Sequence, residues 1–339
     1  MYIYYFLIFL SLIFGRIYSR NENIRLLLIT VYITFCFFVL GFRTEVGVDW
    51  YSYILVYERH VANPLAFDTL EIGYKLINIT GGMTGFGILW VVAVCTLLML
   101  IFTFWGGVRL KLNPFYFFAI ISPYHLVMSG MNLYRQSIAL SIFIVVLSFL
   151  YEGRKGQASI WLILGSLFHV SILAMLPIVL IDMKKRYILP LILLIAPVTL
   201  FGLYLKFGYY IGSSMDNAGF YLRSIFVLIS SLVILMSMKY FKQCNIIKTR
   251  ISVLVIASFP FLVLVSLVST TLSDRISYYF ILLASVAWIK MSEDRNGGYR
   301  YLGTYGELIL FISSMSAFTL WVFFSSHVDD YLFKHILFT

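Results

Sequence analysis

The most constraining feature of this sequence is the recurrence of long apolar windows along almost its whole length. Each window holds about 17 to 22 residues, the length that a helix needs to cross a hydrocarbon core about 30 Å thick. Hydrophobic residues make up 61% of the 339 residues and charged residues 12%, and no soluble core of this size could bury such a surface. We therefore expect an all-α, polytopic integral membrane protein in which residues 1–339 form a single transmembrane domain.

The windows predict about ten spanning helices and one re-entrant or broken-helix hairpin. The spans are expected at residues 2–19, 25–42, 85–105, 113–130, 136–151, 187–205, 222–239, 251–271, 276–291 and 304–325. The first apolar run has no basic region before it and no small-residue cleavage site after it, so it is interpreted as a helix rather than a signal peptide.

Basic residues cluster in alternate loops, for example at Arg109 with Lys111 and at Arg154 with Lys155. Cytoplasmic loops of membrane proteins are enriched in Lys and Arg, so these loops are assigned to the inside. The net charge of +10 then has a topological explanation and does not indicate nucleic-acid binding. The three cysteines have no metal-ligand spacing and indicate neither a disulfide framework nor a metal site.

The hairpin is expected between Ala158 and Ile181, because the basic clusters at 152–156 and 182–186 are both assigned to the cytoplasm. Roughly 24 residues cannot cross the membrane twice at 1.5 Å per residue, but they can form two half-helices. The apex is expected at 168–171. The alternative is one ordinary span, which would invert every later loop.

The segment 43–84 is expected to be a loop at the outer face, and it carries the largest concentration of charge. Its charged residues are Arg43, Glu45, Asp49, Glu58, Arg59, Asp68, Glu71 and Lys75. A carboxylate near an arginine could deprotonate an acceptor hydroxyl while the guanidinium holds phosphate oxygens. Asp49 and Glu71 are candidates for the first role and Arg43 for the second. The alternative is a loop held together by an ion pair between Arg43 and Asp49.

Two further polar residues lie at the ends of predicted helical segments. Arg135 is expected at the outer N-terminus of a helix, where free N–H groups and the helix dipole favour an anion. The alternative is that Arg135 only anchors the helix, with its long side chain snorkelling to the membrane surface.

His169 lies inside the hairpin, where ionisable groups usually face a cavity and have a partner. It is a candidate base or substrate contact, or else it hydrogen-bonds across helices to Ser171.

In the second half of the chain, Arg275 and Tyr279 are expected at an outer helix start, where they could contact an anion or a sugar. Anchoring in the aromatic belt explains the tyrosine equally well. Arg223 follows a loop rich in tyrosine and glycine at 208–221 and is a candidate contact on a mobile lid. The sequence shows no phosphate-binding glycine loop and no Ser-His-Asp order.

Taken in chain order, these residues form short motifs that resemble the EpsG-like branch of the Wzy oligosaccharide-repeat polymerases. The motifs are Arg43, Gly47, Asp49 and Tyr53; Glu71, Gly73 and Tyr74; Asn132, Arg135, Gln136 and Ala139; Phe168, His169 and Ser171; and Arg275 with Tyr279. The sequence lacks the long periplasmic loop with spaced arginines of the ligase-like Wzy branch.

The resemblance implies a GT-C-like membrane glycosyltransferase at the outer side of the bacterial inner membrane. Its substrates would be undecaprenyl-diphosphate-linked repeat units of O-antigen, capsule or exopolysaccharide, and its partners the lipid bilayer and a chain-length regulator protein. Asp49, Glu71 or His169 would be the base. The implied substrate contacts are Arg43, Tyr53, Tyr74, Asn132, Arg135, Gln136, Arg223, Arg275 and Tyr279. Arginines can stabilise the leaving diphosphate without a metal, so no cofactor is expected.

Two other functions remain open at this point. A flippase or transporter of the same lipid-linked sugars would use the broken helix and the histidine at membrane depth, but it should also show repeats between its halves. A polysaccharide O-acetyltransferase would need histidine and arginine on the cytoplasmic side, where this sequence has short basic loops.

Overall fold

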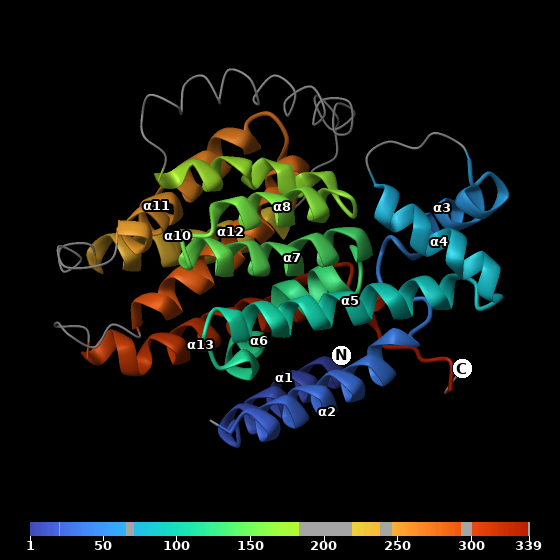
Figure 1. The fold of residues 1–339 in the computed structure, drawn as a ribbon, viewed down its shortest axis with the longest axis horizontal. Coiled ribbons are helices and arrows are strands. Elements are labelled where there is room, and N and C mark those ends of the chain that lie inside the picture. Colours follow the sequence, from blue (N-terminus) through green and yellow to red (C-terminus); the bar gives the residue numbers. More distant parts are fainter. Residues whose placement is uncertain (20, 66–70, 183–218, 238–245, 293–299, 338–339) are drawn as a thin grey trace. The chain divides into compact units, whose positions relative to one another are not determined.

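The computed structural model describes residues 1–19, 21–65, 71–182, 219–237, 246–292 and 300–337 (Figure 1). Within these ranges every regular element is helical, apart from one isolated antiparallel bridge between Arg43 and His335. Six of the described helices are long and apolar enough to cross a membrane. The expected all-α, multi-pass fold is therefore confirmed. The span predicted at 187–205 lies outside the described residues, and the single transmembrane domain stays a prediction.

The chain groups into two compact units, which we describe separately. Unit 1 contains Met1–Ser148, Leu164–His169 and Phe318–Thr339, and unit 2 contains Phe149–Ile163 and Val170–Ala317.

Two helices of unit 1, α2 and α6, begin at an asparagine that caps their first turn. Asn21 accepts hydrogen bonds from the backbone N–H groups of Asn23 and Ile24 and so caps α2. Asn113 caps α6 in the same way, with Pro114 at its first position. The elements are α1 (Tyr2–Arg16), α2 (Glu22–Gly41), α3 (Trp50–Ala62), α4 (Ile72–Thr84), α5 (Ile88–Arg109), α6 (Pro114–Ser122), the π-helix η1 (Pro123–Gly130), most of α7 (Tyr134–Tyr151) and the short 3-10 helix η5 (Asp329–Tyr331).

Helices α5 and α7 run parallel, with α6 and η1 returning between them. Thr103 donates a hydrogen bond to Ser141 at 3.0 Å, and Arg109 donates one to Ser148 at 3.1 Å. Arg109 therefore lies at the end of unit 1 where α5 finishes. The segments 43–49 and 131–135 lie at the opposite end, where α5 and α7 begin.

The expected outer loop at 43–84 is largely helical, because α3 and α4 occupy most of it. The two helices pack closely through glycine, since a Cβ atom on Gly82 would lie 2.9 Å from a methyl group of Val61. Charged residues interrupt the apolar residues of this segment, so it contains no window long enough to predict a span. The segment between the spans is therefore built largely of helix, and its place at the outer face stays a prediction.

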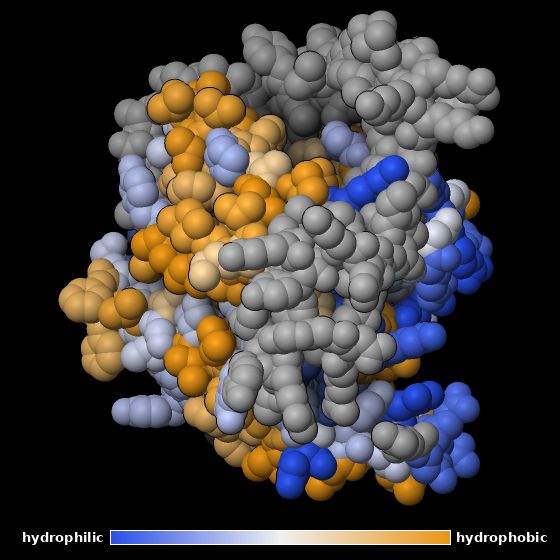
Figure 2. Space-filling view, turned by 90° about the vertical axis from the view of Figure 1, so that its left-hand side faces the viewer, coloured by the Kyte–Doolittle hydropathy of each residue, from blue (hydrophilic) through white to orange (hydrophobic). Residues whose placement is uncertain are grey.

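Unit 2 contains a bundle in which α10, α11 and α12 pack against one another. Its elements are most of α8 (Lys155–Ser166), the 3-10 helix η2 (Val170–Asp182), α10 (Gly219–Ser237), α11 (Ile246–Ser266), α12 (Thr270–Ser292) and most of α13 (Arg300–Phe324). Apolar side chains on α10, including Ile225 and Leu232, are about half exposed, as expected for helices that face lipid. Figure 2 shows exposed hydrophobic residues gathered on the left part of the face that it draws.

The predicted break in the segment 158–181 is confirmed. Helix α8 ends at Ser166, and η2 begins at Val170 and runs back beside it (Figure 1). One uninterrupted span from Ala158 to Ile181 is therefore excluded. Which side of the membrane the two ends of the hairpin face stays a prediction.

Candidate functional site

Polar residues converge at the end of unit 1 where α5 and α7 begin. Arg135, in the first turn of α7, forms an ion pair with Glu71, the residue before α4. The Glu71 side chain is 7% exposed and that of Arg135 28%. Because the carboxylate is shielded from water, this charge-assisted hydrogen bond is stronger than one on an open surface. It joins two segments that lie 64 residues apart in the chain.

Tyrosines line this ion pair. Tyr53 on α3 stacks on Tyr134, with ring centroids 4.4 Å apart, and lies edge-on to Tyr74 at 6.0 Å. The guanidinium carbon of Arg135 lies 5.6 Å from the ring centroid of Tyr53 and 5.5 Å from that of Tyr74, within the range of cation–π attraction. The site is therefore an aromatic enclosure around one arginine and one carboxylate.

Two buried donor groups in this enclosure have no hydrogen-bond partner among the residues that the structure describes. They are the hydroxyl of Tyr74, whose side chain is 1% exposed, and the Nε of Arg135. Buried polar groups are usually hydrogen-bonded, so such atoms are candidates for ligand contacts. Burial raises the pKa of Tyr74 well above its usual value, and the nearby Arg135 only partly opposes this shift. The phenol therefore stays protonated at neutral pH and can donate a hydrogen bond.

Arg43 is completely buried. Its guanidinium donates hydrogen bonds to the backbone oxygen of Leu40 at 2.6 Å, the hydroxyl of Thr96 at 2.9 Å and the backbone oxygen of Gly130 at 2.8 Å. It also lies over the ring of Tyr134. The alternative of an ion pair with Asp49 is wrong for the residues that the structure describes. As placed here, Arg43 ties α2, α5 and η1 together and does not reach an exposed phosphate position.

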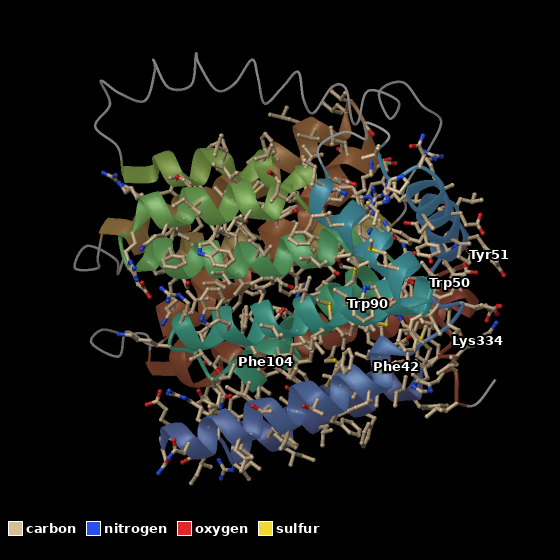
Figure 3. All side chains as sticks on the ribbon, turned by 45° about the vertical axis from the view of Figure 1, so that its right-hand side comes forward. Phe42, Trp50, Tyr51, Trp90, Phe104 and Lys334 are labelled. Atoms are coloured by element: carbon tan, nitrogen blue, oxygen red, sulfur yellow. The ribbon has the colours of Figure 1, made fainter. Side chains whose placement is uncertain are left out.

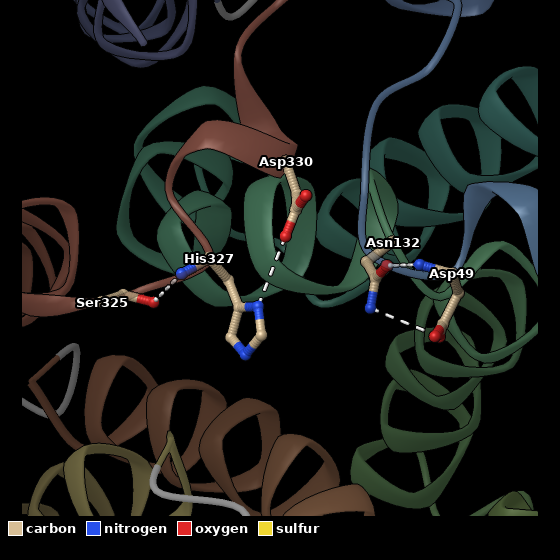
Figure 4. Close-up of polar contacts among 5 residues, drawn as sticks. All are labelled: Asp49, Asn132, Ser325, His327 and Asp330. Carbon is tan, nitrogen blue, oxygen red and sulfur yellow. Dashed lines mark hydrogen bonds and ion pairs between the residues drawn. The ribbon is translucent and has the colours of Figure 1, made fainter.

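Asp49 instead meets Asn132, the residue between η1 and α7 (Figure 4). The Asn132 side-chain oxygen accepts a hydrogen bond from the Asp49 backbone N–H at 2.8 Å, and its amide lies 3.4 Å from the Asp49 carboxylate. Gly47 makes this approach possible, because it has a φ of 100° and a Cβ atom there would lie 2.7 Å from the Met131 oxygen. The half-buried carboxylate of Asp49 is thus fixed in orientation.

The sequence did not predict that residues 327–336 contact the segment that carries Asp49. The backbone N–H of Gly47 donates to the oxygen of Asp330 at 2.7 Å, and that of Thr44 donates to the oxygen of Lys334 at 3.1 Å. Lys334 also pairs with Glu45 at 2.7 Å. Figure 3 shows Phe42, Trp50, Tyr51 and Lys334 at the same end of unit 1, and Figure 4 shows His327 paired with Asp330. The only sequence signal was the polar character of this tail.

The turn that carries His169 is attached to the start of α4. The backbone N–H of Gly73 donates to the oxygen of Leu167 at 2.9 Å, and a Cβ atom on Gly73 would lie 3.1 Å from the Phe168 ring. His169 is 9% exposed. The structure therefore brings together the segments of all three candidate bases, Asp49, Glu71 and His169, within unit 1. Gln136, 1% exposed, lies on α7 next to Arg135.

The remaining candidates form a second cluster inside unit 2. Arg223 is in the first turns of α10 rather than on a lid, and it forms a buried ion pair with Asp274. Its guanidinium lies 4.8 Å from the ring centroid of Tyr278. Tyr279 is fully buried, and its hydroxyl lies 2.9 Å from that of Ser171. Ser171 thus has Tyr279 as a partner, and the hydrogen bond suggested between His169 and Ser171 stays a prediction. The half-buried Arg275 lies between these residues on α12.

Comparison with known proteins gives one match. The family model described as "EpsG family" matches residues 26–335 and so covers both clusters. No curated protein and no solved structure matches the chain.

Proposed function

Because the chain belongs to the EpsG family, whose membership indicates a polysaccharide polymerase-like glycosyltransferase, we propose that it polymerises lipid-linked repeat units. In this reaction a growing glycan leaves a polyprenyl diphosphate, with undecaprenyl as the expected lipid, and is transferred to a sugar hydroxyl of a second lipid-linked unit. The bond from the anomeric carbon to the diphosphate breaks, and a bond from that carbon to the acceptor oxygen forms. The acceptor proton passes to a base.

The observation that carries this proposal is the ion pair of Arg135 with Glu71 inside an enclosure of tyrosines. A diphosphate leaving group gains negative charge as the bond breaks, and a guanidinium fork stabilises such charge through paired hydrogen bonds. The unpartnered hydroxyl of Tyr74 and the Nε of Arg135 are further donors for phosphate oxygens. The arginine thus supplies the electrostatic stabilisation that this chemistry needs, so the proposal requires no metal.

Among the three candidate bases, Asp49 has the most suitable environment. Its carboxylate is half-buried and is oriented by Asn132, whereas Glu71 is held by Arg135. A general base must lie within hydrogen-bond reach of the hydroxyl that it deprotonates, and a carboxylate at the edge of a buried site meets this need. We assign Asp49 as the base, with Glu71 and His169 lining the acceptor position.

The chain is a multi-pass membrane protein. We place it in the bacterial inner membrane with the cluster of unit 1 at the outer face, because Arg109 and Lys111 lie at the opposite end of α5. The family resemblance implies that Arg223, Arg275 and Tyr279 of the second cluster also contact lipid-linked substrates. A chain-length regulator would be a protein partner.

The test is a strain that lacks this protein. We expect long-chain polysaccharide to disappear and single-repeat lipid-linked units to accumulate at the outer face of the inner membrane. The broken helix formed by α8 and η2 is the feature that favours a flippase instead. Accumulation of the same units at the inner face would show that the protein is a flippase and not a polymerase.

A further inference from the structure

Helices α3 and α4 are too short to cross a bilayer. Each has 13 residues and is therefore about 20 Å long, whereas the hydrocarbon core is about 30 Å thick. Helix α4 ends at Thr84, and the candidate span α5 begins at Ile88 after the tight turn of Gly85 and Gly87. The two short helices therefore lie where a membrane-spanning helix meets the membrane surface.

The inward side of this helix pair is polar and aromatic. Tyr53 and His60 on α3 and Tyr74 and Asn78 on α4 are all buried. The side chains of His60 and Asn78 form a hydrogen bond of 2.9 Å that links the two helices. This side faces the ion pair of the candidate site.

The outward side is exposed and largely apolar, and its charged residues, Glu58 and Arg59, lie near the end of α3. On α4, Ile72 and Leu76 are each 56% exposed and Met83 is 82% exposed, and their spacing of four and seven residues places them on one helical face. On α3, Tyr51 and Leu55 are 69% and 63% exposed. Figure 3 shows Tyr51 pointing away from the bundle.

We propose that α3 and α4 form an interfacial element whose outward face is immersed in the boundary between lipid headgroups and acyl chains. The occupant of this face is lipid, because the stripe of α4 leads through the exposed Phe86 directly into the candidate span α5. An amphipathic helix that is too short to span and has one exposed apolar face is typical of such elements. The exposed charges of Glu58 and Arg59 near the end of α3 would remain in the aqueous headgroup layer.

This placement also sets the depth of the candidate site in the membrane. The inference about substrate access that follows rests on the proposed function. Ile72 points outward from the same turn of α4 that presents Tyr74 inward, directly after Glu71. Lipid contact at Ile72 and Leu76 therefore fixes the depth of Glu71, and through it the depth of Arg135, relative to the membrane surface. A polyprenyl diphosphate carries its phosphates at that same depth, so the substrate could reach Arg135 without leaving the bilayer.

The test measures the depth of single labels in the full chain. Leu76→Cys and Met83→Cys are made in a background with Cys36→Ala, Cys95→Ala and Cys244→Ala and carry an environment-sensitive fluorophore. Glu58→Cys, at an exposed charged position near the end of α3, is the control expected to lie in the aqueous headgroup layer. Each protein is reconstituted into nanodiscs of phosphatidylethanolamine and phosphatidylglycerol with lipids brominated near the headgroup end of the chain. Unchanged thermal unfolding relative to the unlabelled background confirms that each variant is folded.

We expect brominated lipid to quench the labels at Leu76 and Met83 severalfold more than the label at Glu58, and aqueous iodide to show the opposite order. Labels at Leu76 and Met83 that iodide quenches as strongly as the Glu58 label, with no effect of brominated lipid, would overturn the proposal. The readout needs no glycan substrate. A protein that shows the lipid quenching but makes no polymer would support the interfacial placement of α3 and α4 and contradict the proposed function.

Discussion

The ring of Tyr53 stacks on that of Tyr134 with the two planes only 19° apart. Each ring of this pair also lies beneath a guanidinium, since Arg135 lies over Tyr53 and Arg43 over Tyr134. The two arginines nevertheless have different environments. Arg43 is completely enclosed by backbone and hydroxyl oxygens, whereas Arg135 is 28% exposed and pairs with a carboxylate. This difference predicts opposite phenotypes for their substitution.

Arg135→Lys should abolish most activity while leaving the amount of protein in the membrane near normal. Lysine keeps the charge but loses the guanidinium fork, and losing a contact made mainly in the transition state would cost on the order of 3 kcal/mol, roughly a hundredfold in rate. Polymer formation by membranes of each variant measures the effect. Arg59→Lys, on the exposed side of α3, is the control and should retain full activity. Wild-type rates in both Arg135→Lys and Arg135→Ala would make Arg135 a membrane anchor.

Arg43→Ala should instead destabilise the protein. The substitution leaves the buried oxygens of Leu40 and Gly130 without their donor, and each unsatisfied buried group costs about 1–3 kcal/mol. We expect a lower unfolding temperature in detergent and less protein in the membrane. A stable Arg43→Ala protein that has lost only activity would contradict the anchoring role and return Arg43 to the substrate site.

Gly47→Ala should disturb both stability and activity. The residue has a φ of 100°, and the new methyl group would collide with the Met131 oxygen, so the segment that carries Asp49 must move away from Asn132. Gly153→Ala is a matched control, because Gly153 also has a positive φ, of 74°, but nothing lies within 4 Å of its Cβ position. Both variants carry backbone strain of about 1–2 kcal/mol, and only Gly47→Ala should lose polymerisation. Equal loss in both would show that strain alone is responsible.

Tyr74→Phe should lower activity by the same factor at every pH between about 7 and 9. Burial raises the pKa of Tyr74 well above its usual value, so the neutral phenol is the form present throughout this range. Since a raised pKa delays ionisation to still higher pH, Tyr74 acts as a hydrogen-bond donor and not as a base. The measurement is the ratio of wild-type to variant rates across the pH range. A ratio that rises steadily with pH would assign Tyr74 the role of base.

Both ends of the segment 158–181 should be accessible from the cytoplasm. The break between α8 and η2 allows the chain to enter and return, and basic residues flank it on both sides. Cysteine labelling at Lys155 and Lys185 in intact cells tests this topology. Position 185 lies outside the described residues, so the prediction rests on the sequence there. Access to the two positions from opposite sides would contradict it.

The long elements of this fold could be predicted because their apolar windows are themselves the signal. Expected spans at 85–105 and 136–151 correspond to α5 and α7, and the break near Phe168 followed from charges on both sides of a segment too short to cross twice. Helices α3 and α4 could not be found in this way, because a helix that lies at the interface needs no continuous apolar window.

The site was predicted as a set of residues but not as a set of contacts. Glu71 and Arg135 were both chosen, yet nothing in the sequence states that they pair across 64 residues. Arg43 was expected at the membrane surface because it follows an apolar run, whereas three oxygens from separate segments enclose it. Contacts between distant segments are set by helix packing, which a single sequence does not reveal.

The pairing of residues 42–47 with 330–336 has a consequence for how the protein is made. Glu45 and its partner Lys334 are separated by 289 positions, so a ribosome that adds about 5–20 residues per second needs about 15–60 seconds to reach the second after the first. During that interval the segment that carries Asp49 is already in the membrane without Asp330, whose backbone oxygen accepts a hydrogen bond from Gly47. Biogenesis must therefore protect a polar, unfinished surface, and catalytic competence should be gained only after Lys334 has been synthesised.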